Sequence, residues 1–255
     1  MLACAHGLEA AAALLAEPSQ AAGVLDAVGD DGFSALLWAE ERGLRSVAQK
    51  LRECGAAAVR RPALSLFRGE PAKVQIKVAE RTVAFNNGGG SYTTLCSTQR
   101  CTVGSKGYFE LEILDISEYS RHQYGFASAT FRRVLGCSQK RLGEDEQSWS
   151  VNPRGQNKWH DGERGNFDFG VSHKLEAGDV VGVACDLENM QMLISVNGGK
   201  LSNGVVFELA PDSVRDGLFA AFSGETGKVR YNLGEAPFKH APPAADYQAF
   251  AAFEA

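Results

Sequence analysis

The sequence lacks the features by which exported, membrane-spanning and nucleic-acid-binding proteins are usually recognised. It contains no uninterrupted apolar run of about 18 residues, which a membrane-spanning helix requires. It has no Asn-x-Ser/Thr glycosylation site, and its alanine-rich opening, residues 1–16, has no basic region and contains the polar residues His6 and Glu9. Its formal net charge of −5 offers no positive field to a phosphate backbone. We therefore expect an intracellular, cytoplasmic protein that binds no nucleic acid and inserts into no membrane.

Clustered residues of the kind that build metal sites and familiar active sites are also lacking. The six cysteines form no Cys-x-x-Cys pair, and the nearest two, Cys96 and Cys101, have no histidine beside them. No Gly-x-Ser-x-Gly, Gly-x-x-x-x-Gly-Lys-Ser/Thr or His-Glu-x-x-His motif occurs. His160 precedes Asp161, but adjacent residues on a turn point apart and no nucleophile accompanies them. We expect no enzymatic activity, no cofactor and no metal ion.

What the 255-residue sequence does contain is two regions of different composition. The first is rich in Ala, Leu and Glu with apolar residues at helical spacing, whereas the second has Val, Ile, Phe and Tyr runs separated by Gly and Asn. This change predicts a helical segment, a linker, a β domain and a C-terminal tail. Their expected boundaries are 1–58, 59–72, 73–243 and 244–255. The helix-face positions expected to be buried are Leu36, Ala39, Val47 and Leu51.

The helical segment contains an internal repeat, because Ala3 and Gly7 return as Ala39 and Gly43 at the same offset. Its second copy, residues 30–56, resembles a degenerate ankyrin repeat of about 33 residues. The hydroxyl of Ser34 can cap the first helix, but the proline that usually follows this position is absent. A plain helical hairpin is the alternative interpretation.

Short strands are expected throughout the β region. Phe109, Leu111 and Ile113 alternate with Tyr108 and Glu110, which predicts a half-buried antiparallel strand over 107–114. Residues 179–196 read as two strands of a meander joined by a tight turn, with a second turn at 197–198. Later strands are expected at 205–209, 218–222 and 228–232. Many short antiparallel strands over about 170 residues predict a sandwich of two sheets.

Several motifs of the β region follow one another in the order of a known family. They include Gly107-Tyr108-Phe109-Glu110, Tyr124-Gly125-Phe126-Ala127-Ser128, Leu142-Gly143-x-Asp145-x-x-Ser148-Trp149, Ile194-Ser195-Val196-Asn197-Gly198 and Val229-Arg230-Tyr231-Asn232-Leu233-Gly234. Over residues 83–243 the chain resembles the SPRY family, and the turn at 158–162 most resembles SPRY domains of the ryanodine-receptor type. The resemblance implies a mainly β fold. The expected architecture is a bent, concanavalin-like antiparallel β-sandwich, preceded here by the small ankyrin-like helical segment.

The resemblance also implies that loops at one end of the sandwich bind short segments of other proteins, without catalysis. Two loops are the candidates: residues 131–141, which follow the strand at 124–128, and residues 223–227 between the last two strands. The second loop lacks a tryptophan that peptide-binding relatives can carry there. The candidate partner-binding residues are Phe131, Arg132, Arg133, Trp159, Glu225 and Thr226.

Each candidate has a simpler structural interpretation. The arginines of the first loop either form a solvated surface or hold carboxylates of a partner peptide with paired hydrogen bonds. Trp159 lies before a turn signal, so it is expected either in the core or at an exposed loop edge, whereas Trp149 is expected in the core.

The functional hypothesis is an adaptor that binds a partner protein or peptide through the loops of its sandwich, with the ankyrin-like helices as a second contact surface. Three alternatives remain at this point: a lectin-like sandwich that binds glycans, the substrate receptor of a ubiquitin ligase, and a hydrolase that uses His160.

Overall fold

A computed structural model describes residues 34–41, 43–56, 64–88, 90–116, 121–131, 134–135, 141–170, 174–199 and 204–253. The chain divides into two compact units, residues 1–63 and residues 64–255. The first copy of the predicted repeat lies outside the described residues. The described part of the first unit therefore corresponds to the second copy alone.

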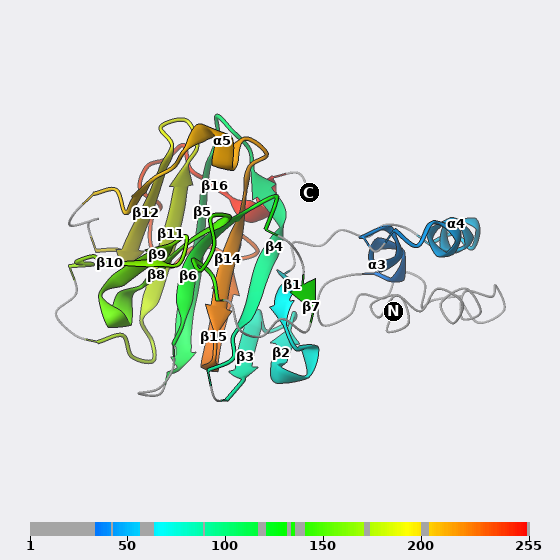
Figure 1. The fold of residues 1–255 in the computed structure, drawn as a ribbon, viewed down its shortest axis with the longest axis horizontal. Helices are drawn as coiled ribbons and strands as arrows, with labels where there is room; N and C mark the ends of the chain where they lie inside the picture. The colour runs from blue at the N-terminus through cyan, green and yellow to red at the C-terminus, as the bar shows by residue number, and fades with distance from the viewer. Residues whose placement is uncertain are drawn as a thin grey trace. The chain divides into compact units, whose positions relative to one another are not determined.

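The described part of the first unit is a pair of helices (Figure 1). These are α3 (Ala35–Glu41) and α4 (Arg45–Glu53). The chain leaves α3 through Gly43, whose positive φ of 67° lets the Leu44 N–H donate to the Ala39 carbonyl at 2.9 Å. All four helix-face positions predicted to be buried are at most 5% exposed, so the predicted helical periodicity is confirmed here. They are Leu36, Ala39, Val47 and Leu51.

The second unit is a sandwich of two eight-stranded sheets (Figure 1), which confirms the predicted mainly β fold. In order across the first sheet, the strands are β10 (Glu163–Asn166), β9 (Asn157–His160), β8 (Ser148–Asn152), β6 (Gln123–Ser128), β14 (Leu218–Gly224), β4 (Thr93–Cys101), β1 (Leu64–Gly69) and β7 (Val134–Leu135). In the second sheet they are β13 (Phe207–Glu208), β12 (Gln191–Val196), β11 (Val180–Asp186), β5 (Lys106–Asp115), β15 (Thr226–Asn232), β3 (Thr82–Asn86) and β2 (Val74–Lys77), with β16 (Gln248–Ala249) paired to β5.

In the described part of the sandwich, three short helical turns lie between strands and a fourth follows the last strand, and nearly all the strand pairs are antiparallel. The turns are η2 (Pro71–Lys73), η3 (Pro153–Gly155), α5 (Pro211–Val214) and η4 (Phe250–Ala252). Among the described strands, only the β1–β7 and β5–β16 pairs are parallel. The strands predicted at 107–114, 179–187, 190–196, 205–209, 218–222 and 228–232 are all present, with boundaries that differ by a few residues.

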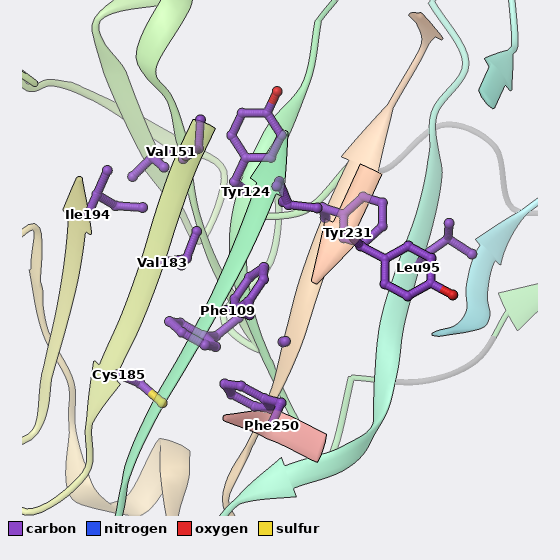
Figure 2. Packing of buried hydrophobic residues seen from close by; sticks show 14 of the residues in the cluster. Leu95, Phe109, Tyr124, Val151, Val183, Cys185, Ile194, Tyr231 and Phe250 are labelled. Atoms are coloured by element: carbon purple, nitrogen blue, oxygen red, sulfur yellow. The ribbon is translucent and has the colours of Figure 1, made fainter. Parts of the chain in front are cut away.

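The core lies between the two sheets, as Figure 2 shows for a group of its residues. Strand β5 supplies Phe109, Leu111 and Ile113, all fully buried, from alternate positions. Their ring and methyl groups meet side chains of the first sheet, for example Phe126, whose ring centroid is 5.7 Å from that of Phe109. The two-residue alternation predicted from the sequence is therefore the arrangement that builds the core.

The outer face of β5 is also covered, although the alternating pattern is usual for a strand with one face in water. Tyr108 and Glu110 are only 1% and 3% exposed. The Glu110 carboxylate accepts backbone N–H groups from Lys239 and His240, each at 2.8 Å, and the Tyr108 ring contacts Phe238 edge-on. The segment after β15 folds back over the second sheet and buries these residues.

Two boundaries differ from the prediction for the same reason. The predicted linker contains β1, whose Leu64 and Leu66 belong to the core, and the predicted tail contains β16 and the fully buried Phe250. Both segments are short and gain their stability by pairing with longer strands, which local sequence pattern does not reveal. The sandwich therefore begins at Leu64 rather than at residue 73 and includes most of the predicted tail.

Candidate partner-binding site

The motif Leu-Gly-x-Asp-x-x-Ser-Trp folds as a turn that leads into β8. Its Leu142 packs with Phe131 on one face of the first sheet, whereas its Trp149 belongs to the core between the sheets. Asp145 accepts the Ser148 hydroxyl at 2.8 Å and forms an ion pair with Arg68 of β1. Gly143 has a φ of +88°, and a Cβ atom there would lie 2.4 Å from the Ser150 hydroxyl oxygen, so only glycine fits. This motif is therefore architectural.

Phe131 lies beneath this segment and is not available as a contact residue. Its side chain is 1% exposed, its ring centroid is 6.1 Å from that of Phe67, and the Arg68 guanidinium carbon lies 3.8 Å from the ring centroid. The ring is therefore part of the packing on this sheet, and we do not include Phe131 in the site proposed below. The other two candidates of this loop, Arg132 and Arg133, lie outside the described residues.

Trp159 is half-buried on β9, with the Arg141 guanidinium over its ring. The guanidinium carbon lies 3.9 Å from the ring centroid, and the indole N–H donates to the Asn157 side-chain oxygen at 2.6 Å. Arg141 is held in place by Glu144, which accepts its Nε–H at 2.8 Å and its backbone N–H at 3.1 Å. The indole therefore has a fixed orientation with part of its surface in solvent.

The same arginine reaches a second aromatic residue. The Arg141 guanidinium carbon is 5.5 Å from the ring centroid of Tyr92, which is 5% exposed and precedes β4. The exposed Arg121 guanidinium donates a hydrogen bond to the Tyr92 side chain. This bond, together with the negative charge of Glu225, raises the pKa of Arg121, which therefore stays charged.

Glu225 occupies the tip of a tight hairpin, because β14 ends at Gly224 and β15 begins at Thr226. The predicted loop at 223–227 is thus almost entirely strand. The Glu225 carboxylate accepts the Gly90 N–H at 2.7 Å, and its backbone carbonyl accepts the Asn87 N–H at 2.8 Å. These bonds fasten the β3–β4 loop, which leads to Tyr92, onto the hairpin.

Thr226 is backed by a buried histidine, His122, which is 2% exposed. The His122 Nε2 lies 2.6 Å from the Thr226 carbonyl oxygen. Since a carbonyl only accepts, Nε2 carries the hydrogen and Nδ1 accepts the Tyr124 hydroxyl at 3.1 Å. Burial lowers the pKa of His122 to about 4, so the ring is neutral at physiological pH.

Four linked residues and the nearby charge of Glu225 thus form a group, which we call the arginine–aromatic cluster: Tyr92, Arg121, Arg141, Trp159 and Glu225. Its members come from loops and strand ends of both sheets. Sequence analysis identified Trp159 and Glu225 and included Arg141 in the first candidate loop, but missed Arg121 and Tyr92. Arg141 stands immediately before the family segment that begins at Leu142, whereas no such signal marks Arg121.

His160 has a structural role in the described residues. Its Nδ1 donates to the Ser148 carbonyl at 2.9 Å, and its ring stacks on Trp149 with centroids 4.8 Å apart. Trp149 itself is 2% exposed, as predicted for a core residue. Among the described residues, no group of three or more His, Cys, Asp or Glu side chains is arranged to hold a metal ion. The described helices include none with the length and apolar character needed to cross a membrane.

Comparison with known proteins gives one family. The model of the SPRY domain matches residues 106–236, slightly more than half of the chain. The crystal structure of the SPRY domain of human HERC1 is similar with 14% identity and a TM-score of 0.45, covering 66% of this chain and 99% of that one. A crystal structure of a human SPRY domain has 18% identity, a TM-score of 0.46 and coverage of 65% and 98%. A search of curated proteins found no significant match.

The family match spans the strands from β5 to β15, and thus Arg121, Arg141, Trp159 and Glu225 of the arginine–aromatic cluster. SPRY domains are protein-interaction domains. This chain belongs to the SPRY family.

Proposed function

We propose that this chain is a non-catalytic interaction module whose sandwich binds a short segment of a partner protein at the arginine–aromatic cluster. The observation that carries this proposal is the series of interactions from Trp159 through Arg141 and Tyr92 to Arg121, with the charge of Glu225 near enough to Arg121 to raise its pKa. This series gathers an aromatic surface, a cation and an anion at one place on the sandwich.

The chemistry of the cluster suits recognition of a polypeptide. Tryptophan, tyrosine and arginine are the residues most enriched where binding energy concentrates in interfaces. Arg121 presents an exposed guanidinium that can hold a carboxylate or carbonyl oxygen of a partner, and Trp159 offers a partly exposed apolar face. Because Arg141 and Glu225 are already fixed by Glu144 and Gly90, a partner would order few side chains on binding.

The helical pair is a candidate second contact surface in the same proposal. An open groove between α3 and α4 is lined by Arg45, Gln49 and Arg52 of α4 and by Glu40 of α3. Glu40 and Arg52 form an exposed ion pair at 2.7 Å. Ankyrin-like repeats present such polar helix surfaces to partners, and the second repeat copy supports that use here.

The test is affinity capture from a cell extract followed by mass spectrometry, with a variant that removes the exposed members of the cluster: Arg121→Ala, Trp159→Ala and Glu225→Ala. A matched control removes one cation, one aromatic residue and one anion elsewhere on the sandwich. Its substitutions are Lys77→Ala, Tyr247→Ala and Glu208→Ala.

The wild type and the control are expected to retain the same specific proteins, and the cluster variant is expected to lose them. Both variants must first show the wild-type unfolding midpoint, so that loss of binding is not loss of fold. Equal capture by the cluster variant and the wild type would contradict the proposed site. Retention on a glycan array that depends on the cluster would contradict the protein-interaction proposal and favour a lectin-like function.

A further inference from the structure

Two cysteines from opposite sheets meet inside the core. Cys101 ends β4 in the first sheet and Cys185 lies on β11 in the second, and both are fully buried. The register partner of Cys185 on the neighbouring strand β5 is Gly107. A Cβ atom at Gly107 would lie 3.2 Å from the Cys101 Cβ. The Cys101 side chain therefore lies against the β5 position that pairs with Cys185.

Glycine at position 107 leaves the space into which the two thiols face. The Cys101 thiol donates to the Thr102 carbonyl at 3.8 Å, and neither cysteine is in a disulfide. A larger residue at 107 would also meet the Phe250 ring at 2.8 Å. The pair therefore occupies a place that the architecture keeps open between the sheets.

We propose that Cys101 and Cys185 are an oxidation site, at which a peroxide joins the two sheets by a disulfide. Hydrogen peroxide first converts the Cys101 thiol to a sulfenic acid and releases one water. The Cys185 thiol then attacks that sulfur, the S–S bond forms, and the sulfenic hydroxyl leaves as a second water with the thiol proton. Two thiols are oxidised by two electrons, and one peroxide is reduced to two waters.

Reaction begins at Cys101 because of its place in the fold. Cys101 is the last residue of its strand, followed by the exposed Thr102 and a turn, whereas Cys185 lies within β11 between two neighbouring strands. Burial, together with the contact with Cys101, raises the pKa of the Cys185 thiol and keeps it protonated until a sulfenic acid forms beside it.

Access to the pair is controlled by the C-terminal segment. Phe250 contacts Gly107. Figure 2 shows the Cys185 sulfur and the Phe250 ring in the same lower part of the core. This ring is held by the two-residue strand β16, by the Ala251 N–H donated to the Leu233 carbonyl at 2.8 Å, and by the ion pair of Lys106 with Asp246. Short pairing of this kind opens more readily than the central strands do.

The bond would cross-link the sandwich and close a loop that includes Arg121, Arg141 and Trp159 of the arginine–aromatic cluster. A cross-link between distant residues restricts the unfolded chain and raises the unfolding midpoint. This inference does not depend on the proposed function, because the thiols lie in the core and touch no cluster residue among the contacts described above.

The test is peroxide treatment of the folded full chain, removal of the peroxide by catalase, alkylation of remaining thiols in denaturant, and peptide mapping without reduction. We expect a linked peptide pair containing Cys101 and Cys185, about 2 Da lighter than the two thiol peptides together, and an unfolding midpoint that falls again on reduction. The link is expected to form several-fold faster in Phe250→Ala, because this variant exposes the pair.

Cys96 provides the matched control, since it is equally buried on the same strand but packs on the opposite face with Phe67 and Ala127. Cys96→Ala is expected to keep the link, and Cys185→Ala is expected to lose it. The inference is overturned if the wild type shows no Cys101–Cys185 peptide while other thiols are oxidised. It is equally overturned if that peptide forms only after the protein is unfolded in urea.

Discussion

The buried His122 makes the stability of this protein depend on pH in a defined window. Its pKa is about 4 in the folded protein, against 6.5 for an exposed histidine. Below pH 6.5 the unfolded chain binds a proton at this residue, whereas the folded protein does not until about pH 4. This protonation stabilises the unfolded state relative to the folded state. The free energy of unfolding therefore decreases as the pH falls between these two values.

The magnitude follows from the two pKa values. One pKa unit corresponds to about 1.4 kcal/mol, so the full difference approaches about 3 kcal/mol. Between pH 7.5 and pH 5, where few carboxylates have yet been protonated, the loss attributable to His122 is about 2 kcal/mol. Burial is the largest cause of the low pKa of His122. The positive charge of Arg154 lowers this pKa further, whereas the hydrogen bond to the Thr226 carbonyl raises it.

Urea unfolding of the wild type and of His122→Gln at pH 7.5, 6.5, 5.5 and 5.0 measures this quantity. Glutamine can still donate to the Thr226 carbonyl but does not titrate, so the variant isolates the contribution of the imidazole. We expect the difference in unfolding free energy between the two proteins to change by about 2 kcal/mol across the series, in favour of the variant at low pH. Parallel pH profiles, or an NMR titration of His122 with a midpoint near 6.5, would refute the reasoning.

Three further substitutions test the packing. Phe250→Ala is expected to lower the free energy of unfolding in urea by about 3–5 kcal/mol, and a loss below about 1 kcal/mol would show that the C-terminal segment is not part of the core. Gly227→Ala is expected to cost about 1–3 kcal/mol, since φ is +107° and the new Cβ would lie 2.6 Å from the Asp115 carbonyl; unchanged thermal unfolding would contradict this. Glu110→Ala leaves two part-buried backbone N–H groups, of Lys239 and His240, without their acceptor, at up to about 1–3 kcal/mol each. Their hydrogen exchange is expected to accelerate, whereas wild-type protection would contradict the assigned bonds.

The central strands were predictable because their residues repeat at the period of the structure they form. Phe109, Leu111 and Ile113 alternate because one face of β5 meets the other sheet, and Leu36 and Ala39 recur because one face of α3 meets α4. In both cases a local pattern and the tertiary environment agree. Such elements can be identified from a single sequence.

The terminal strands of the sandwich were not predictable in the same way. β16 has two residues, and its place beside β5 depends on Phe250 reaching the core. The outer face of β5 was likewise expected to be polar, but Glu110 is satisfied by backbone groups that lie far along the chain. Contacts of this kind depend on chain closure rather than on local periodicity.

The candidate site was predicted only in part, for a related reason. Trp159 and Glu225 stood out by residue type and by their place in turns, whereas Phe131 was assigned to a surface from its loop position and proves to be buried. The cluster exists because Arg141 bridges Tyr92 and Trp159 and because Arg121 lies beside Tyr92. Arg141 lay in a candidate loop, but nothing in the sequence distinguishes Arg121 from other arginines in loops.

The most direct test of the proposed interaction surface is site-specific photo-cross-linking to a captured partner. A photoreactive amino acid is placed at position 164, an exposed position on β10 that pairs with Trp159, or at position 77 on the edge strand β2, and each protein is irradiated with the partner bound. The proposal predicts a cross-linked product from position 164 and none from position 77. Cross-linking from position 77 alone would show that the partner lies elsewhere on the sandwich and would contradict the proposed site.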